Sequence, residues 1–239
     1  MSLPIEAAGP KKVAYFRNRD PWGLTSNEAV MNAYGIPFDS YTSFDFGNVN
    51  LSGYDKILIA SCQPYSFYQA LEANSGWFES YIASGGIFEF HGATYSSDDW
   101  SGLVMPTGFT SEMAFYNDVE IVDPLHDIAM IPNVITDEEL DGWLYSSHGF
   151  LKDIMLSYDV LIRDSDSGNP VAIEIFLQKG AVVATMQTLE WAYDRGYSPI
   201  LENFIMYMTI RYEHDIAVKR IFVPDINERT LPVTVNATI

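Results

Sequence analysis

The chain has 239 residues, of which 32 are acidic and 13 are basic, so its formal net charge is −19. A charge of this sign repels phosphate backbones and disfavours nucleic-acid binding; its simplest interpretation is a solvated acidic surface. Hydrophobic residues make up 48% of the chain, enough for the core of one large domain. No uninterrupted apolar run reaches the roughly 18 residues of a membrane-spanning helix, so we expect no membrane span.

The N-terminal segment and the cysteine count bear on compartment and metal binding. Residues 1–11 form a leader that lacks the basic stretch followed by an apolar stretch of a signal peptide. The compartment stays open between the cytoplasm and, for a processed protein, the cell surface. The single cysteine, Cys62, excludes an internal disulfide framework and a multi-cysteine metal cluster.

The first half of the chain alternates predicted strands and helices. Short apolar runs predict strands at residues 13–16, 36–41, 57–60 and 87–90. The aliphatic run at 57–60 is unbroken, which is typical of a strand buried on both faces of a sheet. Helical patterns between the strands predict one helix over about 25–35 and another over about 66–84.

The second half begins irregularly and then returns to regular elements. Residues 94–159 are rich in Gly, Pro, Trp and Tyr, and predict long loops with a strand at 119–122 and a helical turn at 136–139. Two further strands, at 160–163 and 171–176, flank the polar turn DSDSGNP and form a hairpin. A buried strand at 182–185 and a last helix from Pro199 through Tyr212 follow.

Together these elements predict an α/β domain over residues 12–216. We expect a flavodoxin-like, doubly wound and mostly parallel sheet, with helices on both faces and an antiparallel hairpin at one edge. The tail at 217–239 alternates apolar and polar residues. It is predicted to be a short β-type extension or the start of a following domain.

The order of several segments resembles a known superfamily. These segments are YDKILIASCQ, GGIFEFHGA, GNPVAIEIFLQKGAVVATMQTLEWAYD and ILENFIMYM. They resemble the class I glutamine amidotransferase-like superfamily, and most of all its non-amidotransferase branch of trehalose-utilisation (ThuA-like) proteins. The resemblance spans roughly residues 12–212 and implies the same flavodoxin-like fold.

The resemblance also implies that an activity is missing. Active amidotransferases carry a Gly-x-Cys-x-Gly elbow, and here Phe90 stands at the nucleophile position, where it can neither attack nor be activated. His91 and Gly92 match the His-Gly of the related intracellular-protease branch, again without its cysteine. The later His-x-Glu pair of the family falls on Thr188 and Glu190, so only the glutamate is kept. We therefore expect no glutamine amidotransferase activity.

Candidate site residues follow predicted parallel strands, whose carboxyl ends converge on one crevice. His91 and Glu190 are the candidates for acid–base catalysis, although His91 could equally serve to close its turn by hydrogen bonds. The candidates for ligand binding are Arg17, Asp20, Gln63, Trp100 and Trp191.

The arginine, the aspartate and the two tryptophans among these candidates each have a structural alternative. An arginine beside an aspartate can bind an anion or form a surface ion pair. The two tryptophans can stack on a sugar ring or plug the crevice as core aromatics. No cofactor and no metal are expected, because His126 and His148 lack the compact spacing of a metal motif.

Three functions are compatible with these residues. The leading hypothesis is a non-amidotransferase domain with a degenerate site that binds a small polar ligand, with a carbohydrate as the favoured class. The second is a hydrolase or isomerase that uses His91 and Glu190 as an acid–base pair. The third is a structural module of a larger surface protein. The oligomeric state is not predicted.

Overall fold

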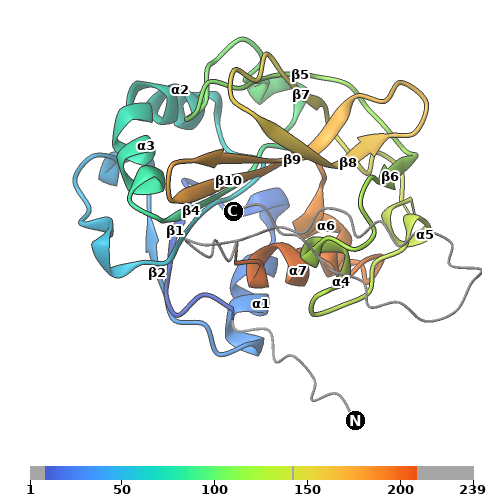
Figure 1. Cartoon of the computed structure of the whole chain (residues 1–239), viewed down its shortest axis with the longest axis horizontal. Coiled ribbons are helices and arrows are strands. Elements are labelled where there is room, and N and C mark those ends of the chain that lie inside the picture. Colours follow the sequence, from blue (N-terminus) through green and yellow to red (C-terminus); the bar gives the residue numbers. More distant parts are fainter. Residues whose placement is uncertain (1–8, 142, 209–239) are drawn as a thin grey trace, which may run out of the picture. The chain divides into compact units, whose positions relative to one another are not determined.

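The computed structural model describes residues 9–141 and 143–208, and its centre is an eight-stranded sheet (Figure 1). The strands lie in the order β2-β1-β3-β4-β10-β9-β8-β6. Their bounds are β1 Val13–Phe16, β2 Phe38–Tyr41, β3 Lys56–Ile59, β4 Ile87–His91, β6 Val119–Ile121, β8 Tyr158–Asp164, β9 Pro170–Leu177 and β10 Gly180–Thr185. A separate two-stranded sheet pairs β5 (Thr110–Glu112) with β7 (Phe150–Lys152).

The sheet is mixed, which corrects the expectation of a mostly parallel one. Strands β2, β1, β3, β4 and β10 pair in parallel, as predicted for the centre. Strands β9, β8 and β6 continue the sheet in antiparallel fashion. The turns that join β8 to β9 and β9 to β10 are too short for a parallel crossover, which needs a dozen or more residues.

Alternation along β4 gives the sheet two different faces. Phe88 and Phe90 point to one face and belong to a cluster of buried apolar side chains. Glu89 and His91 point to the other face. The sequence IFEFH therefore builds an aromatic core on one side of the sheet and places charged groups on the other.

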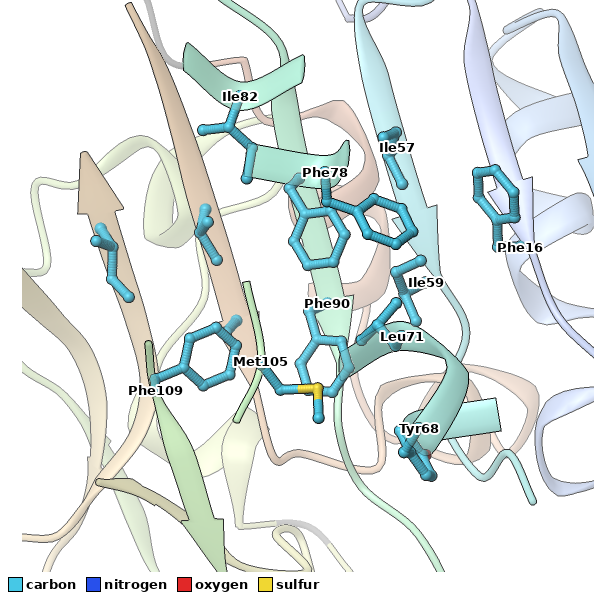
Figure 2. Packing of buried hydrophobic residues seen from close by; sticks show 14 of the residues in the cluster. Phe16, Ile57, Ile59, Tyr68, Leu71, Phe78, Ile82, Phe90, Met105 and Phe109 are labelled. Atoms are coloured by element: carbon cyan, nitrogen blue, oxygen red, sulfur yellow. The ribbon is translucent and has the colours of Figure 1, made fainter. Parts of the chain in front are cut away.

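Helices α2 (Tyr65–Ala73) and α3 (Ser75–Ala83) cover the aromatic face (Figure 1). Figure 2 shows Phe78 of α3 and Phe90 of β4 within this cluster, with Met105 and Phe109 from the loop beyond β4. A single helix was expected at 66–84. It is broken at Asn74, which leaves helical geometry (φ −110°, ψ 14°) while its side-chain amide donates to the carbonyl of Ala70 at 2.8 Å.

Helices on the other face are shorter. They are α1 (Ser26–Ala33), α4 (Asp127–Met130), α5 (Asp137–Leu140), α6 (Leu189–Asp194) and α7 (Ile200–Met206). The turn expected at 136–139 is α5, and Thr136 with Glu139 forms its capping box. Helix α7 was expected to run through Tyr212 but ends at Met206, where Lys56 Nζ donates to two carbonyls of its last turn at 2.8 and 3.0 Å.

Two expectations lie outside the described residues: the β-type tail at 217–239 and most of the leader at 1–11. Within the described ranges, no helix has both the length and the apolar character needed to cross a bilayer.

Phe90 tests the aromatic core. Replacing Phe90 with Ala should lower the free energy of unfolding by about 3–5 kcal/mol, because a fully buried ring is lost and the packing closes only partly. The matched control is Phe44→Ala, since Phe44 is 89% exposed and its loss should cost less than about 0.5 kcal/mol. Urea unfolding of both variants measures the difference, and equal effects would contradict the assignment of Phe90 to the core.

Candidate functional site

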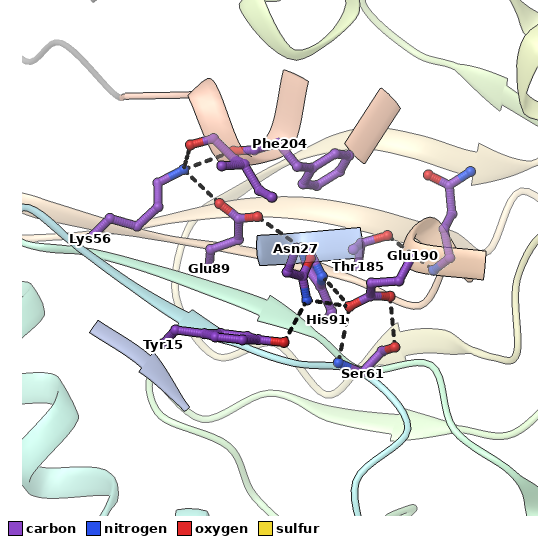
Figure 3. Close-up of polar contacts among 11 residues, drawn as sticks. Tyr15, Asn27, Lys56, Ser61, Glu89, His91, Thr185, Glu190 and Phe204 are labelled. Carbon is purple, nitrogen blue, oxygen red and sulfur yellow. Dashed lines mark hydrogen bonds and ion pairs between the residues drawn. The ribbon is translucent and has the colours of Figure 1, made fainter. Parts of the chain in front are cut away.

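Four charged side chains form a continuous buried chain on the face of the sheet opposite the aromatic core (Figure 3). Lys56 Nζ lies 2.6 Å from Glu89 Oε2, and Glu89 Oε1 lies 2.8 Å from His91 Nε2. His91 Nδ1 lies 2.9 Å from Oε1 of Glu190, the second residue of α6. None of the four is more than 1% exposed. We call this set the ionic chain.

The far end of the ionic chain is held by neutral donors. Ser61 Oγ donates to Glu190 Oε2 at 2.7 Å, and the side-chain amide of Asn27 donates to Glu190 Oε1 at 3.1 Å. Ser26 Oγ also donates to the backbone carbonyl of Glu190 at 2.8 Å. The hydrogen bonds and ion pairs of the ionic chain therefore connect α1, β3, β4, α6 and α7.

The charges of the ionic chain balance. Both ring nitrogens of His91 face carboxylate oxygens, so both donate, which only the protonated ring can do. Burial lowers the pKa of His91, but Glu190 and Glu89 outweigh this and raise it to about 9. Burial raises the pKa of Glu190, yet His91 and Ser61 bring it down to about 2. Burial lowers the pKa of Lys56, but its ammonium faces only acceptors.

Polar side chains after β1 and β3 fix the loop that follows β1. Gln63 is fully buried, and its Oε1 accepts from the backbone N–H groups of Asn18 (2.7 Å) and Arg19 (3.1 Å). Arg17 pairs with Asp20 and, at 2.6 Å, with Glu28. The structure thus gives Gln63, Arg17 and Asp20 partners inside the protein.

A left-handed residue follows the parallel strand β3, at Cys62, whereas the expected elbow after β4 has none. Phe90 lies within β4 and has ordinary strand geometry, whereas Cys62, after β3, has φ 56°. Its backbone N–H donates to the carbonyl of Ala93 at 2.7 Å. The thiol is buried and its pKa is raised by burial, so it is protonated at neutral pH and is a poor nucleophile.

Trp100 belongs to the core. Its indole N–H donates to the carbonyl of Gly92 at 2.8 Å, and its ring stacks on Tyr68 at 5.8 Å. The side chain is fully buried on the aromatic face of the sheet, where a ligand cannot reach it.

A cavity of about 190 Å³ opens beside the carboxyl ends of the parallel strands. Its walls come from the loops after β1, β4 and β10 and from the loop before β7, which is where ligands bind in open α/β sheets. We call it the aromatic cavity; its lining residues are Trp22, Tyr95, Leu144, Tyr145, His148, Thr188 and Trp191. Of the residues predicted for the site, Trp191 alone lines it.

Ring contacts shape the aromatic cavity. Trp22 lies edge-on to Tyr95 and to His148, with centroids 5.0 and 5.2 Å apart. Trp22 (φ 55°) and Tyr145 (φ 60°) both hold left-handed backbone conformations, which bulky residues rarely adopt. Such strain persists only where the surroundings impose it, and it concentrates at ligand sites.

Helix α6 joins the ionic chain to the aromatic cavity. Glu190 points into the ionic chain, while the next residue, Trp191, lines the cavity and stacks on Tyr197 at 5.6 Å. The ionic chain lies under the site and holds this helix in place. His91 and Glu190 are therefore in contact with each other, but neither lines the aromatic cavity.

Several residues that matter in the structure are not among the site residues predicted from the sequence. Lys56 and Glu89 carried a usable signal, since a charge inside an aliphatic central strand must find a partner. Trp22 lies in the same loop as the candidates Arg17 and Asp20, and His148 is considered from the sequence only as a metal ligand. Tyr145 lies in the irregular segment, where no periodic pattern places a side chain. Among the described residues, no group of three or more His, Cys, Asp or Glu side chains is arranged to hold a metal ion.

The pH dependence of stability tests the ionic chain. His91 has a folded-state pKa of about 9, above its ordinary 6.5. Its stabilising contribution is therefore complete below pH 6.5 and is lost progressively as pH rises through 9. The urea midpoint of the wild type should fall between pH 6.5 and pH 9. The variant His91→Gln should have a lower midpoint than the wild type at pH 6.5, and its midpoint should change much less over the same pH range. A wild-type midpoint that stays level from pH 6.5 to 9 would contradict the protonated His91.

Sequence comparison gives a distant relative. No family model matches the chain. An uncharacterised protein of Clostridium acetobutylicum is 27% identical over 210 residues, which is 85% of this chain and 21% of that protein. The chain thus spans about a fifth of the length of this curated relative.

Structure comparison gives the fold. A protein of Thermoplasma acidophilum that is assigned to GMP synthase has a TM-score of 0.55 at 14% identity, covering 82% of this chain and 92% of that one. A glutamine amidotransferase from Thermotoga maritima has a TM-score of 0.52 at 11% identity, covering 81% and 96%. A cytoplasmic protein of Salmonella typhimurium also scores 0.52, at 12% identity, covering 81% and 99%. These likenesses support the expected glutamine amidotransferase-like fold, and membership of the ThuA-like branch stays a prediction.

Proposed function

We propose that this chain is a non-amidotransferase domain of glutamine amidotransferase-like fold that binds a small polar ligand, a carbohydrate, in the aromatic cavity. The observation that carries the proposal is the cavity itself. It lies at the carboxyl edge of the parallel strands, and five of its seven lining residues carry aromatic rings. Ligand sites have this mostly apolar lining with a few polar groups.

Size and lining favour a single sugar ring. The volume of about 190 Å³ is below the roughly 300–1,000 Å³ of drug-sized sites. The CH faces of a pyranose can pack on the indole of Trp191 or Trp22. The Tyr95 and Tyr145 side chains are each about half exposed at the rim, where their hydroxyl groups are available to ligand hydroxyls.

Acid–base catalysis by His91 and Glu190 is the alternative enzyme function. Their contact of 2.9 Å is suitable for such a pair. Both side chains are completely buried, and each already makes its hydrogen bonds within the ionic chain. We therefore assign them a structural role, positioning α6, and assign ligand binding to the aromatic cavity.

We propose that the domain works as one part of a longer protein. Its curated relative is about five times as long as the matched segment. In that setting a binding domain supplies recognition, and a purely structural module would be the alternative. The two differ in whether the aromatic cavity takes a ligand.

Ligand binding can be measured directly. We expect methyl glycosides of common hexoses to bind the full chain in calorimetric titrations, and Trp191→Ala to weaken binding about tenfold, because a stacking surface worth about 1.4 kcal/mol is removed. Tyr158→Ala is the control, since Tyr158 is 39% exposed and lies outside the cavity. If no glycoside binds the wild type, or if both variants bind alike, carbohydrate binding at this cavity is wrong.

Glutamine hydrolysis should be absent. Phe90 is a core residue at the position of the family nucleophile, and Thr188 stands where the family has its histidine. Incubation with glutamine should release no ammonia above a boiled-protein blank. Release above that blank, abolished by Cys62→Ser, would show that the chain uses a nucleophile at another strand end.

A further inference from the structure

We infer that His148 determines the class of ligand, by offering the Nε2 lone pair to a hydroxyl group of an uncharged ligand in the aromatic cavity. This inference rests on the proposed function, since it names the atom that would recognise the ligand there. It assigns a specificity role to a residue that the sequence analysis weighed only as a metal ligand.

The hydrogen bond on the opposite side of the ring sets the tautomer. His148 Nδ1 lies 2.8 Å from the backbone carbonyl of Thr94, and a carbonyl can only accept. Nδ1 therefore carries a proton. Burial lowers the pKa of His148 below its ordinary value, so the ring is neutral at pH 7 and Nε2 has no proton. Nε2 is a hydrogen-bond acceptor.

The position of His148 is fixed by contacts that leave Nε2 without a hydrogen-bond partner among the described residues. Its backbone N–H donates to the carbonyl of Met186 at 2.9 Å, and Phe115 lies edge-on to the imidazole at 5.0 Å. Trp22 contacts it from the cavity wall. No side chain or backbone group in the described ranges donates a hydrogen bond to Nε2. His148 is half-buried, so Nε2 can accept a hydrogen bond from a hydroxyl group of a ligand that enters the cavity.

The charge of the lining selects among donors. None of the seven lining residues is an acid, a lysine or an arginine, although the chain as a whole carries −19. A carboxylate ligand would place its negative charge against the Nε2 lone pair, and the nearby cation Arg195 lies over the Trp191 ring without lining the cavity. A quaternary ammonium would be attracted by the rings, but it has no N–H and would leave Nε2 unpaired. A neutral polyol satisfies the rings and the acceptor together.

Nuclear magnetic resonance on the wild-type chain tests the tautomer. With ¹⁵N-labelled histidine at pH 7, His148 should show the pattern of a ring protonated at Nδ1 alone, and a bound methyl glycoside should shift its Nε2 resonance. His126 provides an internal contrast, because its Nδ1 accepts from the backbone N–H of Ile128 at 3.2 Å and its proton must lie on Nε2 when neutral. A protonated Nε2 on His148 overturns the inference without the need for any variant.

A matched variant tests the acceptor. In His148→Asn the amide N–H can still donate to the Thr94 carbonyl, while the Nε2 acceptor is gone. We expect the methyl glycoside that binds best to the wild type to bind at least tenfold more weakly to this variant, with the fold checked by circular dichroism. Glucuronate and tetramethylammonium, the charged probes, should bind the wild type more weakly than that glycoside.

The outcomes separate the two claims. If the glycoside binds His148→Asn as well as the wild type, but binds Trp191→Ala poorly, the inference is overturned and the proposed function stands. If tetramethylammonium binds better than every glycoside and its binding survives His148→Asn, the cavity is an aromatic cation site and the inference is overturned. If no probe binds the wild type, the proposed function fails and the inference fails with it.

Discussion

A carboxylate in the middle of a central strand is the constraint on which the rest of this structure depends. Glu89 lies on β4, with parallel strands on both sides, and is completely buried. An unpaired charge in this position would cost several kcal/mol, so the fold must bring cations to it. Lys56 from β3 and His91 from the same strand supply them. Each cation then contacts a further group, and these contacts reach the helices.

Those contacts decide where two helices lie. Lys56 donates to carbonyls that the end of α7 leaves without helical partners, and this interaction coincides with the end of the helix at Met206. His91 draws in Glu190, which fixes the first turn of α6. Since Trp191 follows directly, the ionic chain also sets one wall of the aromatic cavity. The ionic chain under the sheet edge and the aromatic cavity at that edge are thus joined through α6.

The fold and the residues at its crevice lead to different functional conclusions. The fold resembles that of proteins named for glutamine chemistry, whereas Phe90, the residue that the family resemblance sets at the nucleophile position, is a core residue. The carboxyl edge of the sheet remains the place where loops converge. Here those loops bring aromatic rings, strained backbone at Trp22 and Tyr145, and a neutral histidine. This combination is the basis of the proposed binding of an uncharged ligand.

The sequence by itself determined the parallel centre of the sheet, because aliphatic runs such as that at 57–60 fit only strands buried on both faces, and it showed that Phe90 cannot act as a nucleophile. It also indicated that Lys56 and Glu89 need oppositely charged partners, because both are charged residues within apolar strands. Strand topology also placed His91 and Glu190 at the same sheet edge, and they do meet there, 2.9 Å apart. Only the tertiary structure decided that both are completely buried, because burial depends on how α1, α6 and α7 pack over the sheet. It likewise decided that Trp22, Tyr145 and His148 share one cavity, since irregular loops have no periodicity from which side-chain direction can be read, and their positions follow from ring packing and backbone hydrogen bonds across the sheet edge.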